Sequence, residues 1–100
     1  MKPDLLVHQP GSMAGNYAVV EVKAAVALNG GVDKDIETLS LFRSDVGYLR
    51  AIYLIYGDIS NSRINRLWRA AERTERLASI EVWIHAAPGE HASHEFTLGT

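Results

Sequence analysis

Leu49–Tyr56 constrains the fold more than any other segment, because its sequence (LRAIYLIY) is nearly all apolar and aromatic and closes at Gly57. A run of this kind is typical of a strand that is covered on both faces of its sheet. Stretches with the apolar spacing of a helix lie on both sides of it, upstream at Ile36, Leu39 and Phe42 and downstream at Ile64, Leu67, Trp68, Ala71 and Ala78. A buried strand between two amphipathic helices predicts an α/β domain.

The remaining elements are predicted from periodicity and from capping and turn residues. In chain order they are a hairpin of Leu5–His8 and Tyr17–Val26 around the turn Gln9-Pro10-Gly11, a helix from the N-cap Asp33 to about 44–47, the strand Leu49–Tyr56, a helix from Ser60 or Ser62 to about Ala78, and the strand Ser79–His85. Residues 90–100 are expected to form a tail, or else a short edge strand. The order β-β-α-β-α-β predicts a mixed sheet whose last two strands are parallel, with helices packed against it.

Composition places the chain among ordinary globular domains. Of its 100 residues, 47% are hydrophobic and 22% are charged, which predicts a single domain over residues 1–100 and excludes a disordered chain. The absence of cysteine excludes disulfides and thiolate zinc sites, and the apolar runs are too short to cross a membrane, so we expect a cytoplasmic protein. A net charge of −2 offers no general attraction for nucleic acid, so phosphate binding would need a local patch or a bound metal.

Glu21 and Lys23 have the pattern with the clearest chemistry, because side chains two residues apart on a strand point to the same face. The hairpin would bring Asp4 beside them, so that two carboxylates and an ammonium share one exposed face. Mg²⁺ prefers oxygen ligands with few protein carboxylates, and the backbone carbonyl of Val22 would add an uncharged ligand. Lys23 would then orient a water or stabilise a phosphodiester transition state. The alternative is a solvated Asp4 and a polar Glu21/Lys23 pair on a solvated strand.

Pro3-Asp4, Glu21 and Lys23 together resemble the motif of the PD-(D/E)xK nucleases, the superfamily with the restriction-endonuclease-like fold. The resemblance spans roughly Lys2 to Tyr56. It implies cleavage of DNA or RNA that depends on Mg²⁺ or Mn²⁺, with Asp4 and Glu21 as metal ligands and Lys23 as the catalytic lysine. Family members usually begin with a helix and a strand that this chain lacks before the motif, so the chain is expected to be a fragment or to be completed by a second subunit. We therefore expect a homodimer.

Five arginines recur at spacings of three or four residues in the second predicted helix. They are Arg63, Arg66, Arg69, Arg73 and Arg76. One interpretation is a substrate-binding surface that follows nucleic-acid phosphates beside the active site. The other is a solvated helix face, with Glu72 pairing with Arg69 and Arg76.

His91 and His94 are three residues apart beside Glu95, a spacing that would hold a metal ion on a helix. Pro88-Gly89 upstream argues against a helix, so a flexible tail is the favoured interpretation. Two function hypotheses follow from the whole sequence. The first is a Mg²⁺-dependent nuclease. The second is a dimerising or partner-binding module that has the same fold and no activity.

Overall fold

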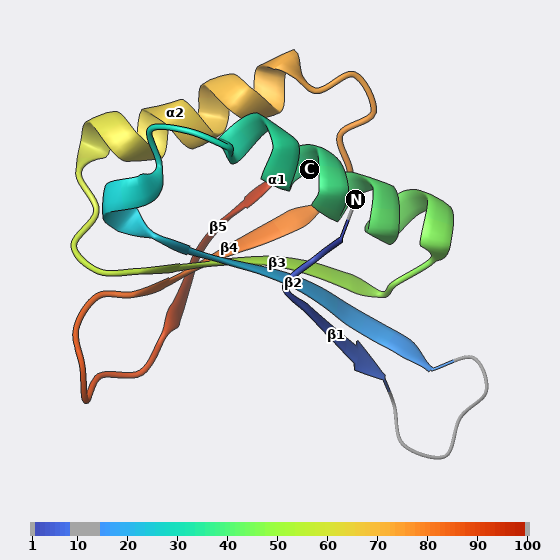
Figure 1. The fold of residues 1–100 in the computed structure, drawn as a ribbon, viewed down its shortest axis with the longest axis horizontal. Coiled ribbons are helices and arrows are strands. Elements are labelled where there is room, and N and C mark those ends of the chain that lie inside the picture. The colour runs from blue at the N-terminus through green and yellow to red at the C-terminus, as the bar shows by residue number, and fades with distance from the viewer. Residues whose placement is uncertain (1, 9–14, 100) are drawn as a thin grey trace.

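The computed structural model describes residues 2–8 and 15–99, and within them the chain forms a five-stranded mixed sheet with two α-helices (Figure 1). The elements are β1 (Leu5–His8), β2 (Asn16–Ala24), α1 (Val32–Leu41), β3 (Arg50–Tyr56), α2 (Asn61–Arg73), β4 (Ile80–His85) and β5 (Ser93–Leu98). The predicted α/β class is confirmed. The turn predicted at Gln9-Pro10-Gly11 lies outside the described residues.

Sequence order and spatial order of the strands coincide, β1-β2-β3-β4-β5. The three central strands are parallel to one another, and the edge strands β1 and β5 are antiparallel to their neighbours. The parallel pairing predicted for the last strand–helix–strand unit is therefore confirmed. Because both crossovers step in the same direction across the sheet, α1 and α2 lie on the same face of it (Figure 1).

The core lies between the helices and this face of the sheet. Every second residue of β3 is buried there, including Tyr53 and Ile55, which are fully inaccessible. The side chains between them point to the helix-free face, where Ile52 and Leu54 are only partly buried and Tyr56 is 50% exposed. The prediction that this strand is covered on both faces is therefore wrong, because both helices pack on one side.

The helix ends differ from the predictions in two places. The N-cap of α1 is Gly31, in the left-handed conformation with φ 74°, and not Asp33, which lies in the first turn. Ser60 caps α2 through its side chain, which accepts the Arg63 N–H. This helix ends at Arg73 instead of about Ala78, because Thr74 adopts an extended conformation.

The C-terminal segment 93–98 is strand β5, so the prediction of a tail is wrong for these residues and the edge-strand alternative applies. Its anchors are apolar: Leu98 is fully buried, and Phe96 stacks on Trp68 of α2 at 5.1 Å between ring centroids. His94 stacks on Trp83 in the neighbouring strand, so it is not part of a helical histidine pair. Within the described residues, neither helix has the length and apolarity that crossing a bilayer requires.

Candidate functional site

Glu21 and Lys23 lie on the same face near the C-terminal end of β2, as their spacing requires. That face is the one covered by the helices, since Val19, two residues earlier, belongs to the core. Glu21 is only 7% exposed, whereas Val22 points to the helix-free face and is 41% exposed. The prediction of an exposed face is therefore wrong for Glu21, because α1 packs over this end of the strand.

Asp4 lies beside Glu21, as the hairpin predicts. The Asp4 N–H donates to Glu21 Oε1 at 3.1 Å, and the Val22 N–H donates to Asp4 Oδ2 at 2.8 Å. Since β1 begins at Leu5, Asp4 lies just beyond the last paired residue of the hairpin. The N–H and the carbonyl of a strand residue point to the same edge, so the Val22 carbonyl also faces the Asp4 side.

Lys23 contacts α1 and the turn before it. Its Nζ lies 2.9 Å from Asp35 Oδ2 and donates to the Gly30 carbonyl at 3.0 Å. A Cβ added at Gly31 would approach the same nitrogen to 2.8 Å, so a side chain there would displace the ammonium from its position. The glycine therefore provides both the left-handed turn into α1 and the space for Lys23.

Two residues that the sequence analysis did not assign to the site, Asp35 and Tyr53, complete the cluster. The Tyr53 hydroxyl donates to Asp35 Oδ2 at 2.6 Å from a fully buried position in β3. Burial, and then the hydrogen bond to Asp35, raise the pKa of Tyr53 far above its ordinary value, so the phenol remains a donor. The only signal in the sequence was chemical, because a tyrosine in a buried strand needs a partner for its hydroxyl.

The electrostatics of the cluster centre on Glu21. Burial, followed by repulsion from the carboxylates of Asp4 and Asp35, raises the pKa of Glu21 to about 7. Its other neighbour, Lys23, directs its ammonium to Asp35. Within residues 2–8 and 15–99, no ion pair joins the buried Glu21 carboxyl group to a cation.

The donor set is chemically suited to a hard divalent cation. Asp4, Glu21 and the Val22 carbonyl all offer oxygen atoms, and Mg²⁺ commonly takes one or two carboxylates and keeps several waters. Within residues 2–8 and 15–99, no three His, Cys, Asp or Glu side chains are grouped so as to hold a metal ion. A metal site here would therefore have to rely on two carboxylates together with backbone and water.

The predicted arginine stripe is divided among different surroundings. Arg66, Arg69 and Arg73 line a small pocket with the segment that leads into α1 and the first residues of that helix, whereas Arg63 is partly buried outside it. Arg76 follows the end of α2, and its Nη2 lies 3.8 Å from Asp45. The prediction of a single continuous stripe is wrong, because α2 ends before Arg76. Within the described residues, the pairing of Glu72 with Arg69 or Arg76 is not formed.

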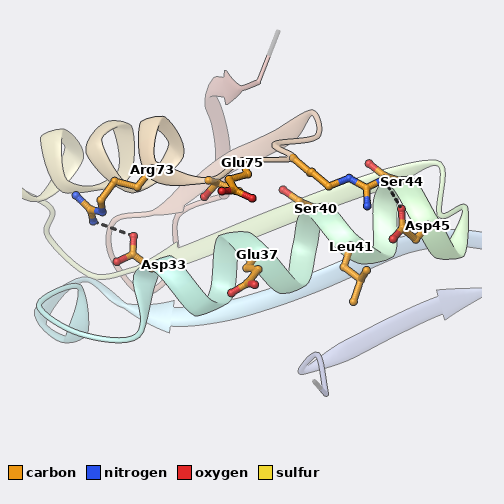
Figure 2. A pocket seen from close by; sticks show the side chains of 10 residues that line it. Asp33, Glu37, Ser40, Leu41, Ser44, Asp45, Arg73 and Glu75 are labelled. Carbon is orange, nitrogen blue, oxygen red and sulfur yellow. Dashed lines mark hydrogen bonds and ion pairs between the residues drawn. The ribbon is translucent and has the colours of Figure 1, made fainter.

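A larger pocket of about 500 Å³ lies between α1 and the segment that ends α2 (Figure 2). Arg73 forms an ion pair with Asp33 at 2.8 Å at one end of the pocket, and the ion pair between Arg76 and Asp45 lies at the other end. Glu37 and Glu75 also line it, so its charge is mixed. Neither Glu21 nor Lys23 lines this pocket, which is therefore separate from the cluster at the end of β2.

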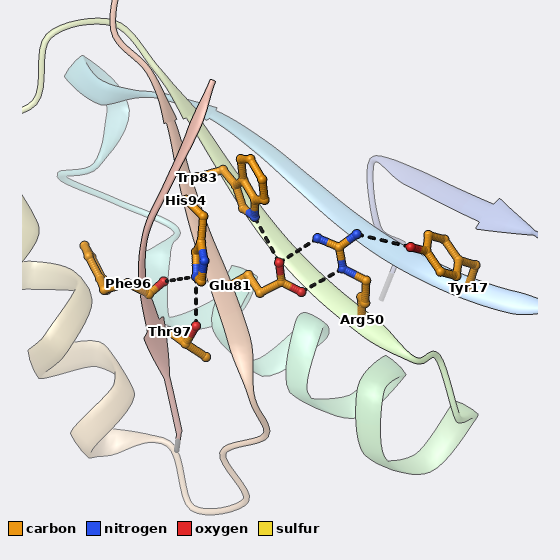
Figure 3. A network of polar contacts seen from close by, with 7 residues as sticks. All are labelled: Tyr17, Arg50, Glu81, Trp83, His94, Phe96 and Thr97. Carbon is orange, nitrogen blue, oxygen red and sulfur yellow. Dashed lines mark hydrogen bonds and ion pairs between the residues drawn. The ribbon is translucent and has the colours of Figure 1, made fainter. Parts of the chain in front are cut away.

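The histidine and aromatic residues have structural surroundings. His8 packs edge-on against the buried Tyr48, with ring centroids 5.9 Å apart. On the helix-free face, Arg50 forms a two-point ion pair with Glu81, which also accepts a hydrogen bond from Trp83 (Figure 3). These contacts join strands across the sheet and lie on the opposite side from Glu21.

Comparison of the chain with protein-family models, with curated proteins and with solved structures found no match.

Proposed function

We propose that this chain is a metal-dependent phosphodiesterase that hydrolyses the backbone of DNA or RNA, as its resemblance to the PD-(D/E)xK nucleases implies. One observation carries the proposal: Glu21 is buried beside Asp4 and Asp35, and its pKa is raised to about 7. A buried carboxyl group under repulsion gains most from a cation bound next to it. The position, at the carboxyl end of a parallel strand, is the usual location of sites in α/β sheets.

In this proposal Asp4, Glu21 and the Val22 carbonyl hold Mg²⁺ or Mn²⁺. A bound ion would supply the means to activate a water and to offset the charge that develops on the phosphodiester. Lys23 is the catalytic lysine, and its ammonium donates hydrogen bonds to a phosphate oxygen. Asp35 and Tyr53 are positioning residues, since Tyr53 donates to Asp35 and Asp35 pairs with Lys23.

Cleavage of labelled single- and double-stranded DNA and RNA in Mg²⁺ or Mn²⁺ tests the proposal. Asp4→Ala and Glu21→Ala should abolish both cleavage and the rise in melting temperature caused by the metal. Lys23→Ala should abolish cleavage while the metal still stabilises the fold, because its role is in the reaction. Glu37→Ala, which removes an exposed carboxylate elsewhere on α1, is the matched control and should retain activity.

Two results would contradict the proposal. One is a wild-type protein that neither gains stability from Mn²⁺ nor cleaves any of these substrates. The other is cleavage that survives Glu21→Ala in a variant whose circular dichroism spectrum is that of the wild type.

The second candidate function is a dimerising module, and the helix-free face of the sheet favours it. This face presents Leu5, Val22 and Tyr56, which are 53%, 41% and 50% exposed. Its principal charges, Arg50 and Glu81, neutralise each other. An apolar and internally neutral face suits packing against a second copy of itself.

Light scattering over a range of concentrations tests this candidate. A wild-type dimer that becomes a monomer in Val22→Lys would support packing through the helix-free face. A wild type that stays monomeric at high micromolar concentration would exclude it. Because Val22 contributes only backbone atoms to the proposed metal site, this variant separates the two functions.

A further inference from the structure

A second pocket lies where α2 passes the start of α1. Its volume is about 210 Å³, which is room for a phosphate group with some hydration. One wall is the segment 28–33, which contains Gly30 and Gly31, and the other is formed by Arg66, Arg69 and Arg73 of α2. The pocket is open to solvent, because all three arginines are exposed.

The charge of this pocket is positive. Among the described residues that line it, Asp33 is the only one with a carboxylate, and Arg73 pairs with it at 2.8 Å. Among residues 2–8 and 15–99, neither Arg66 nor Arg69 forms an ion pair. Two guanidinium groups therefore face the pocket without a carboxylate partner, and guanidinium groups bind phosphate oxygens with two parallel hydrogen bonds.

The pocket shares residues with the surroundings of Lys23. Gly30, whose carbonyl accepts from Lys23 Nζ, lines the pocket, and so does Gly31, which leaves space for that ammonium. The first N–H groups of α1 belong to the same segment and add partial positive charge. A nucleic-acid strand at Lys23 would thus have a second phosphate position close by.

We propose that the pocket formed by Arg66, Arg69, Arg73 and Gly30-Gly31 binds a phosphate group of the substrate next to the one that is cleaved. The inference rests on the proposed function for the identity of that substrate. It assigns the phosphate position to Arg66, Arg69 and Arg73, which line the pocket, and excludes Arg63 and Arg76, which do not. The phosphate is either at a strand end or an internal phosphodiester, and both present the same oxygen atoms.

Binding of short single-stranded DNA, with and without a 5′-phosphate, is measured by fluorescence anisotropy in EDTA so that no cleavage occurs. Arg66→Ala/Arg69→Ala should weaken binding by about tenfold or more. Lys34→Ala/Arg76→Ala removes two cations outside the pocket and should change affinity by less than about threefold. Glu21→Gln should retain this binding even though it should lose cleavage. Failure of the proposed phosphate pocket can therefore be distinguished from failure of the proposed nuclease activity.

The pattern of losses identifies the phosphate. A loss confined to the phosphorylated strand assigns the pocket to a terminal phosphate, and an equal loss for both strands assigns it to an internal phosphodiester. An equal loss in the two double variants would instead reflect overall charge and would overturn the proposal. Full affinity in Arg66→Ala/Arg69→Ala would overturn it as well.

Discussion

Glu21 and Glu81 lie on opposite faces of the same sheet, and their pKa values shift in opposite directions. On the helix-free face, hydrogen bonds from Arg50 to both oxygens of Glu81 hold the pKa of that carboxyl below its ordinary value (Figure 3). On the helix-covered face, burial and the charges of Asp4 and Asp35 raise the pKa of Glu21 to about 7. Both are glutamates on parallel strands, so the difference comes from their neighbours.

Glu81 therefore has a cationic partner within the fold, whereas Glu21 forms no ion pair within the part of the chain that the structure describes. Arg50 donates hydrogen bonds to the two carboxylate oxygens of Glu81 at 2.6 and 2.8 Å. This ion pair is complete within the fold and contributes to stability. Glu21 lies near an ammonium that is directed to Asp35 instead. A carboxyl group whose ionised form is destabilised in the folded protein lowers the free energy of unfolding, and a ligand that binds the ionised form offsets this loss. Groups of this kind are characteristic of functional sites.

The largest expected effect is from Glu21→Gln without metal. Because the folded pKa of about 7 exceeds the ordinary value of 4.5, the wild type keeps the full contribution of Glu21 below about pH 4.5 and loses it as the pH rises through 7. Glutamine keeps the shape without the charge, so at pH 8 it should raise the free energy of unfolding by about 3 kcal/mol. Chemical denaturation from pH 5 to 8 measures this, and a variant less stable than wild type at pH 8 would contradict it.

Glu81→Gln should act in the opposite direction and with a smaller magnitude. Because the pKa of Glu81 is lowered, its contribution is present at neutral pH and is lost on acidification. Breaking the ion pair leaves a partly exposed Arg50 without its carboxylate, so we expect a loss of about 1–2 kcal/mol at pH 7. An unchanged denaturation midpoint would show that the pair is not a source of stability.

Asp33→Asn should have the smallest effect. Asp33 and Arg73 form an ion pair at 2.8 Å, but their side chains are 63% and 60% exposed, so solvent screens the interaction. We expect a change within about 0.5 kcal/mol in thermal denaturation at physiological salt. A loss as large as that of Glu81→Gln would mean that the exposure of Glu21, Glu81 and Asp33 does not determine the order of their effects on the free energy of unfolding.

The sequence predicted those features of the site that depend on local periodicity. The spacing of Glu21 and Lys23 placed them on one face of a strand, and the hairpin placed Asp4 next to them. It predicted that this face would be exposed, which is wrong for Glu21, because Ala18, Val19 and Val20 form a continuous apolar run whose lack of alternation does not show which face is buried. For the same reason, the apolar Leu49–Tyr56 did not reveal that one side of β3 stays free of helices.

The partners that complete the site could not be predicted, because they come from elements distant in sequence. Asp35 joins the cluster only through the packing of α1 on β2. In the sequence, its position in the first turn of a helix was already explained by the favourable interaction of a negative charge with the helix dipole. The end of α2 could not be predicted either, because no glycine or proline that would end a helix follows Arg73 before Ala78. The strand at 93–98, in contrast, had a readable signal in the alternation of Phe96 and Leu98 with polar residues.

The most direct test of a cation site at Glu21 is the number of protons released when Mn²⁺ binds, measured by titration calorimetry in buffers of different ionisation enthalpy. Because the pKa of Glu21 is raised to about 7 and a metal ligand must be ionised, wild type should release part of a proton from it per ion at pH 7, and less at pH 8. Glu21→Gln should bind weakly and release none, and Glu81→Gln should match the wild type. Binding without proton release, or no binding heat at all, would contradict the account.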